Sequence, residues 1–61
     1  MNKKNFWVIK HDGETEFRYS LDEINEIIKE LKDGTTYTLF FYVYVERFDA
    51  WACPIKKVIT K

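Results

Sequence analysis

The stretch TLFFYVYV, residues 38–45, constrains this chain more than any other feature. It carries no charge, glycine or proline, and its aromatic and β-branched side chains are typical of a β-strand. Successive side chains of a strand point to opposite faces of the sheet, so both faces are apolar here. A chain of 61 residues has material to cover one of them. We therefore expect part of this strand to remain uncovered within one molecule.

Residues 1–61 are expected to form a single small domain, because a chain of this length is too short for two. Such a domain buries about 60% of its unfolded surface. Ten basic and ten acidic residues cancel, which removes the usual electrostatic reason for binding duplex nucleic acid or an anionic membrane. Cys53 has no second cysteine to pair with, and the apolar run at residues 6–9 is too short for a signal peptide or a membrane span. A cytoplasmic location without membrane association is expected.

A β-hairpin is predicted at the start of the chain. Asp12-Gly13 favours a two-residue type I′ turn, which would join strands at residues 5–11 and 14–19. Alternation then separates two sets of side chains. The set that we assign to the core is Phe6, Val8, Phe17 and Tyr19, and the set on the other face is Trp7, Ile9, His11, Glu14, Glu16 and Arg18.

A helix is predicted after Ser20, which forms a capping box with Glu23 three residues later. Gly34 is expected to end this helix. Its apolar residues recur at helical spacing and form one stripe, consisting of Leu21, Ile24, Ile27, Ile28 and Leu31. One aliphatic stripe of this kind covers one face of a sheet.

Two further strands, at residues 36–47 and 52–60, complete a ββαββ order. A right-handed crossover from the second strand through the helix to the third must pass over the first strand. The expected fold class is therefore α+β, a four-stranded antiparallel sheet of order 2-1-3-4 with one helix on one face. The facing of the last strand depends on the length of the loop before it; the loop length that we favour places Ile55 and Ile59 in the core.

The residues that carry chemistry form no catalytic or metal-binding constellation. His11, Asp12 and Glu14 could be imagined as metal ligands, but Asp12 is explained by the turn, and a structural site requires about four ligands. Ser20 is explained by the helix cap and has no base spaced to activate it. Cys53 is interpreted as a small buried or half-buried residue, with a reactive thiol near Lys56 and Lys57 as the less expected alternative. We expect no catalytic residues, no metal, no cofactor and no enzymatic activity.

The face away from the helix is the predicted site of function. Assigning the odd positions of residues 36–47 to the helix leaves Phe40, Tyr42 and Tyr44 on the other face, where Trp7 and Ile9 are also expected. Such a patch would expose roughly 400–600 Å², which reaches or exceeds what a typical monomer shows. A polar rim would surround it, as in protein interfaces, formed by Glu14, Glu16, Arg18 and Glu46. The predicted partner-binding residues are Trp7, Ile9, Phe40, Tyr42, Tyr44, Arg18 and Glu46.

These features predict a non-enzymatic protein-interaction module that binds a partner protein or a second copy of itself as a homodimer. Phage and other mobile elements encode many small inhibitors and regulators of host proteins, and this chain would suit such a role. The alternative is single-stranded nucleic acid that stacks on the same aromatic rings, with phosphates near Lys10, Arg18, Lys56 and Lys57. The acidic rim and the zero net charge disfavour it.

Two other interpretations remain open. The N-terminal residues, or the loop before the last strand, could fold over the aromatic side chains, so that the patch is simply covered. A small-molecule pocket is the least expected, because a flat sheet without a second layer offers little concavity.

Overall fold

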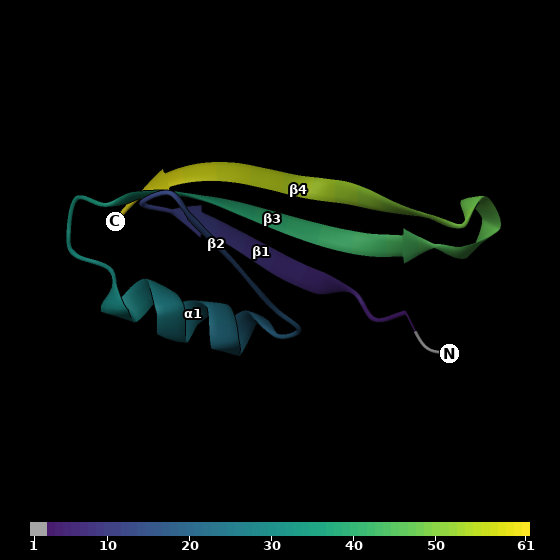
Figure 1. Ribbon diagram of the computed structural model, residues 1–61, viewed down its shortest axis with the longest axis horizontal. Coiled ribbons are helices and arrows are strands. Elements are labelled where there is room, and N and C mark those ends of the chain that lie inside the picture. Colours follow the sequence, from purple (N-terminus) through teal and green to yellow (C-terminus); the bar gives the residue numbers. More distant parts are fainter. Residues whose placement is uncertain (1–2) are drawn as a thin grey trace.

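The structure, a computed structural model that describes residues 3–61, contains a four-stranded antiparallel sheet and one α-helix (Figure 1). The strands are β1 (Phe6–His11), β2 (Glu14–Arg18), β3 (Thr36–Val45) and β4 (Ala50–Thr60), and the helix is α1 (Leu21–Glu30). The strand order is β2-β1-β3-β4, with α1 on one side of the sheet. The predicted α+β fold class, element order and strand order are confirmed.

The β1–β2 hairpin forms as its turn residues predict. Asp12 and Gly13 both have positive φ, 48° and 77°, as a type I′ turn requires. The register pairs His11 with Glu14 and Ile9 with Glu16, which is the predicted register. Opposite residues share a face, so these four side chains all point to the same side of the sheet.

The N-terminal cap of α1 is the predicted one. Ser20 Oγ accepts a hydrogen bond from the Glu23 backbone N–H at 3.2 Å and donates one to Glu23 Oε1 at 3.0 Å. The C-terminus differs from the prediction, because α1 ends at Glu30 and not at Gly34. Gly34, with φ of 91°, lies in the turn that follows, where a positive φ favours glycine.

Lys61 closes the C-terminal end of α1 in place of a glycine. Its Nζ donates to the backbone carbonyls of Ile28 at 2.8 Å, Lys29 at 3.0 Å and Leu31 at 2.7 Å. The last carbonyls of a helix lack partners within the helix and attract positive charge. This contact joins the end of β4 to the end of α1.

The core lies between α1 and the sheet. Ile9 of β1 and Ile24 of α1 are fully buried, with Tyr37 beside them. The half-buried side chains that pack against these three are Trp7, Ile27, Ile28, Leu31, Leu39 and Ile59. A core this small leaves the opposite side of the sheet without a covering layer (Figure 1).

The predicted facing of β1 and β2 is wrong. Trp7 and Ile9 face α1, whereas Phe6, Val8, Phe17 and Tyr19 were assigned to that side. The pairing of β1 with β3 sets Ile9 opposite Leu39 and Trp7 opposite Phe41, so the odd positions of both strands share one face. The sequence alone does not define the register between β1 and β3. A shift of one residue moves every side chain of a strand to the other face.

The facing of β4 follows the favoured alternative. Ile59 lies opposite Tyr37 and packs on the core, and Ile55 lies opposite Phe41. A bulge then interrupts the register, so that β4 contributes one extra residue between its pairs with Phe41 and Val43.

The bulge returns Trp51 to the side away from α1, opposite Tyr44. Trp51 was expected in the connecting loop but belongs to β4, because a tight turn, Glu46–Phe48 followed by Asp49 with φ of 47°, makes the connection.

The β3–β4 hairpin extends well past α1 (Figure 1), and the molecule is elongated, with extents of 41 × 18 × 16 Å. In the described part of the chain, no helix has the length and apolar character needed to cross a membrane.

Shortening Ile24 to valine tests the contact on which the core rests. Ile24→Val is expected to lower the free energy of unfolding by about 0.5–1.5 kcal/mol, because it removes a fully buried methylene. Val58→Ala, at an exposed position of β4, should change the free energy by about 0.5 kcal/mol or less. Urea unfolding followed by circular dichroism measures both, and equal effects would contradict the assigned core.

Candidate binding surface on the open face of the sheet

The side of the sheet away from α1, here called the open face, carries a continuous group of aromatic rings. Phe6 is central: its ring centroid lies 5.2 Å from Tyr42, 5.0 Å from Trp51 and 6.1 Å from Phe17. The remaining contacts, within 6.2 Å, join Phe17 to Tyr19, Tyr42 to Phe40 and Trp51 to Tyr44. Aromatic pairs at these distances stabilise the sheet, so the open face is an ordered surface.

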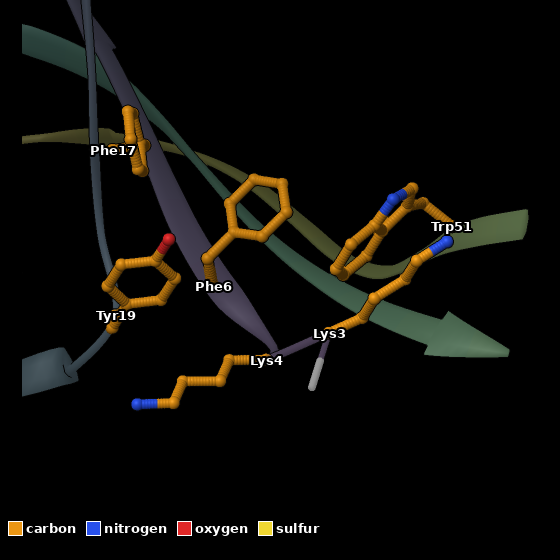
Figure 2. A pocket seen from close by; sticks show the side chains of 6 residues that line it. All are labelled: Lys3, Lys4, Phe6, Phe17, Tyr19 and Trp51. Atoms are coloured by element: carbon orange, nitrogen blue, oxygen red, sulfur yellow. The ribbon is translucent and has the colours of Figure 1, made fainter. Parts of the chain in front are cut away.

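Three of the seven rings of the open face are exposed to solvent, and the other four are half-buried. The exposed fraction is 55% for Phe17, 60% for Tyr19 and 43% for Trp51. The connection before β4 contacts the rings through Asp49, which is bonded to Tyr44, and Lys3 and Lys4 lie along their edge (Figure 2). The described residues therefore leave a large apolar patch open, which marks an interaction surface in most proteins.

Lysine side chains lie over these rings. Lys10 and Lys56 both place Nζ near Phe40, at 5.4 and 5.8 Å from its centroid. Lys3 Nζ lies 4.4 Å from the centroid of Tyr44, and Lys4 Nζ lies 6.0 Å from that of Tyr19. These distances are those of cation–π contacts, in which the stem of the lysine also covers apolar surface. The open face therefore combines aromatic surface with four positive charges.

Carboxylates are absent from the strand positions of the open face. Glu14 and Glu16 lie opposite His11 and Ile9, on the side of α1. Other acids lie on α1 itself, namely Asp22, Glu23, Glu26 and Glu30. The prediction that Glu14 and Glu16 rim the aromatic residues is therefore wrong, because it depended on the facing of β2. The zero net charge of the chain therefore does not describe the charge of the open face.

Asp49, in the turn between β3 and β4, is the carboxylate in contact with the open face. It accepts a hydrogen bond from the Tyr44 hydroxyl and lies 3.4 Å from Lys3 Nζ. The bond from Tyr44, followed by the contact with Lys3, holds the pKa of Asp49 below its usual value. The same carboxylate raises the pKa of Lys3, so both groups are charged at neutral pH.

A concavity of about 480 Å³ lies at the end of the open face near the N-terminus (Figure 2). Its lining consists of Lys3, Lys4, Phe6, Phe17, Tyr19 and Trp51. A volume of this size falls within the range of about 300–1,000 Å³ typical of small-molecule sites. The flat surface expected from the sequence is therefore hollowed at one end.

The structure brings together part of the predicted partner-binding set. Phe40, Tyr42 and Tyr44 share the open face as expected. Trp7 and Ile9 lie on the other side of the sheet, in and beside the core.

Arg18 lies apart from the aromatic rings, because it is opposite Trp7 and so points to the side of α1. Glu46 begins the turn after β3 that also holds Asp49. The aromatic residues that the prediction missed on the open face are Phe6, Phe17, Tyr19 and Trp51. The alternation in the hairpin does place the first three on one face of the sheet, but that face was assigned to the core.

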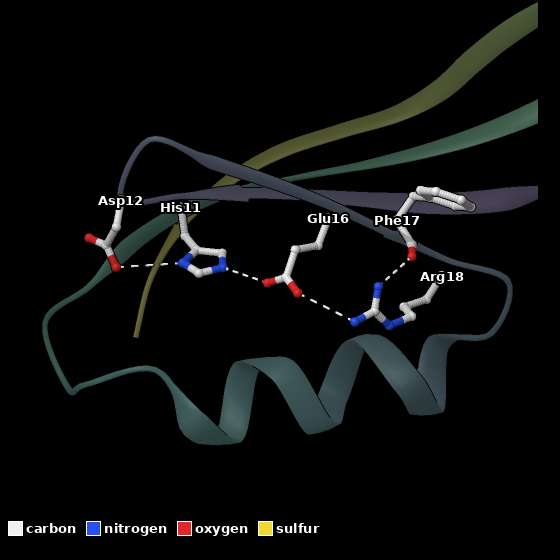
Figure 3. Close-up of polar contacts among 5 residues, drawn as sticks. All are labelled: His11, Asp12, Glu16, Phe17 and Arg18. Atoms are coloured by element: carbon white, nitrogen blue, oxygen red, sulfur yellow. Dashed lines mark hydrogen bonds and ion pairs between the residues drawn. The ribbon is translucent and has the colours of Figure 1, made fainter.

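His11 and its neighbours form a polar network on the side of α1 (Figure 3). His11 is buried, with Nε2 at 2.9 Å from Glu16 Oε2 and Nδ1 at 3.5 Å from Asp12 Oδ2. Arg18 donates to Glu16 Oε1 at 3.3 Å and to the Phe17 carbonyl at 2.7 Å. The hydrogen bond with Glu16 raises the pKa of His11 against the effect of burial, and the bond with His11 lowers the pKa of Glu16.

This network does not provide a metal site. Among residues 3–61, no group of three or more His, Cys, Asp or Glu side chains is arranged to hold a metal ion. Ser20 is occupied by the helix cap, with Oγ bonded to Glu23. The expected burial of Cys53 is wrong, because Cys53 is exposed in the bulge of β4, where its Sγ donates to the Ile55 carbonyl at 3.1 Å.

The pair formed by His11 and Glu16 predicts a pH window for stability. The raised pKa of His11 gives stabilisation that is complete below its usual value of 6.5 and is lost as the pH rises through the folded-state pKa. The lowered pKa of Glu16 gives stabilisation that is present above 4.5 and is lost as the pH falls through the folded-state pKa. The contribution of the pair is therefore largest between about pH 4.5 and 6.5.

Glu16→Gln removes this contribution and leaves the other titrating groups in place. The difference in free energy of unfolding between the native protein and the variant should be greatest inside that window and smaller on both sides. NMR titration of the His11 ring should also show a lower pKa in the variant. An unchanged His11 pKa would contradict the network.

Comparison with known proteins gives no match to a protein-family model, a curated protein or a solved structure.

Proposed function

We propose that this chain is a non-enzymatic binding protein whose open face binds single-stranded nucleic acid. The observation that carries the proposal is the position of four lysine ammonium groups over or beside aromatic rings of the open face, whose strands carry no carboxylate among the described residues. Aromatic side chains interleaved with positive charge are the combination that single strands recognise, through base stacking and phosphate contacts.

The arrangement favours a single strand over a duplex. Bases in a duplex are stacked on one another and cannot lie on a ring of the protein, whereas unpaired bases can. The rings of Phe40, Tyr42, Phe6 and Phe17 cross β3, β1 and β2 in an unbroken series, so several bases could lie along them. Stacking tolerates every base, so weak sequence preference is expected.

On the sequence, the expected acidic rim and the zero net charge disfavoured binding of single-stranded nucleic acid. Glu14 and Glu16 lie on the side of α1, and Lys10 and Lys56 lie on the open face, so the local charge supports binding to phosphates. Attraction to a polyanion depends on the charge of the contacting surface, which the net charge of the chain does not describe.

A partner protein is the second candidate, favoured by the extent of the aromatic surface. Exposed Trp and Tyr side chains dominate binding hot spots, and a small inhibitor or regulator could act by covering another protein. Lysine, however, is depleted at protein interfaces. A homodimer that paired two open faces would set four lysines against four, which costs free energy. Nucleic acid explains both the rings and the lysines.

Salt dependence and two neighbouring lysines test the proposal. A labelled oligothymidylate should bind at low salt, with log K falling against log salt at a slope of about −0.7 per phosphate contact, or about −3 for four lysines. Lys56→Glu on the open face should weaken binding by about tenfold and make the slope shallower by about 1. Fluorescence anisotropy measures both quantities, and a matched oligouridylate shows whether DNA or RNA is preferred.

Lys57→Glu is the matched control, since Lys57 is the next residue of β4 and lies opposite Leu39 on the other side of the sheet. It makes the same change of net charge and should leave affinity nearly unchanged. Equal losses from the two variants would show attraction to overall charge and contradict the open face as the site. Absence of oligonucleotide binding at low salt would leave the partner protein as the better candidate.

Two exposed phenylalanines test the role of stacking. Phe17→Ala removes a ring from the open face and should weaken oligonucleotide binding by about 5- to 150-fold, because stacking on one aromatic side chain is worth about 1–3 kcal/mol. Phe48→Ala removes a ring of similar exposure from the turn after β3 and should have little effect. Equal affinity of the Phe17→Ala variant and the native protein would mean that bases do not stack there.

A further inference from the structure

The concavity at the N-terminal end of the open face has aromatic walls. Phe6 lies between Trp51 on one side and Phe17 with Tyr19 on the other (Figure 2). The rings of Trp51 and Phe17 are inclined to that of Phe6 by 68° and 75°. These are edge-to-face contacts, so the three rings form one continuous aromatic wall, and the concavity of about 480 Å³ lies against it.

The two lysines of the lining lie at opposite ends of this space. Lys4 Nζ is near Tyr19, and Lys3 Nζ is near Trp51 and Tyr44 (Figure 2). The site therefore consists of an apolar centre with one positive charge at each end. A ligand that complements it has a flat ring in the middle and an anion on either side.

We propose that this concavity seats one unstacked nucleotide of the bound strand. The base contacts Phe6 and Trp51, and the two phosphates that flank the nucleotide lie at Lys3 and Lys4. The inference rests on the proposed function and makes it more specific, since it assigns one base to a defined seat while the rest of the strand crosses the flat part of the open face. A nucleotide within a chain has a phosphate on both its 3′ and 5′ sides, and this matches the two separated lysines.

Asp49 controls one end of the seat. Its carboxylate lies 3.4 Å from Lys3 Nζ and also accepts a hydrogen bond from the Tyr44 hydroxyl. A phosphate at Lys3 must therefore replace or oppose this carboxylate. The arrangement lowers affinity at this end of the strand, and it identifies a substitution that should increase binding.

Nucleotides that differ in their phosphates test the seat directly. The Trp7→Phe variant leaves Trp51 as the source of tryptophan fluorescence, because the chain has two tryptophans and Trp7 packs against Phe41 on the other side of the sheet. Thymidine 3′,5′-bisphosphate should quench Trp51 and bind about tenfold more tightly than thymidine 5′-monophosphate, which is the effect of one additional charge-assisted contact. Thymidine and inorganic phosphate should each bind more weakly than the monophosphate.

Asp49→Asn should raise the affinity for the bisphosphate by about two- to fivefold, since it removes a competing surface ion pair. Asparagine tolerates the positive φ of this position, so the turn is expected to be retained. Lys3→Met and Lys4→Met should each reduce the affinity for the bisphosphate to about that for the monophosphate. Lys57→Met, on the other side of the sheet, is the control and should leave both affinities unchanged.

The outcomes separate this inference from the proposed function. If oligothymidylate binds and Lys56→Glu weakens it, but no nucleotide quenches Trp51, the seat is wrong and the proposed function stands. Inorganic phosphate that binds as tightly as the bisphosphate also overturns the seat, because the base would then contribute nothing. If neither nucleotides nor oligonucleotides bind, while a polyglutamate peptide quenches Trp51, both proposals fail and an acidic protein becomes the partner.

Discussion

The rest of this structure depends on the contact between α1 and one side of the sheet. Ile24 of the helix packs on Ile9 of the central strand β1, and both are fully buried. Residues 3–61 contain one α-helix, and its single aliphatic stripe packs against this side of the sheet. Because no second layer exists among the described residues, the opposite side must face solvent, although all four of its strands carry aromatic side chains. The open face is therefore a direct consequence of building a small domain on one helix.

The same division sorts the charges. The acids of α1 and the carboxylates of β2 lie on the covered side, where Glu16 meets His11 and Arg18. The open face receives lysines, whose long stems lie on the rings while the ammonium groups reach water. The net charge does not describe how the charges are distributed over the surface. A chain with equal numbers of acids and bases can therefore present a positive surface to a partner. Local charge therefore decides which partners the open face can attract.

Sequence reasoning recovered the elements whose signals are local. The Asp12-Gly13 turn, the Ser20 cap and the strand order all depend on short-range patterns or on the handedness of one crossover. The facing of β1 and β2 could not be recovered, because both faces of these strands carry aromatic and aliphatic residues and alternation does not say which faces the helix. The predicted surface contains the same error. Phe40, Tyr42 and Tyr44 were placed correctly on the open face, whereas Trp7 and Ile9 were predicted there in place of Phe6 and Phe17.

The bulge in β4 shows how a single backbone irregularity completes the surface. From Ile55 to Ile59 the odd positions of β4 face α1, and without the extra residue Trp51 would face the same side. The insertion reverses the alternation, so that Trp51 lies opposite Tyr44 and against Phe6. Bulges commonly redirect a side chain in this way. Here the redirected ring becomes one wall of the concavity, and the sheet gains a hollow at the end where Lys3 and Lys4 approach it.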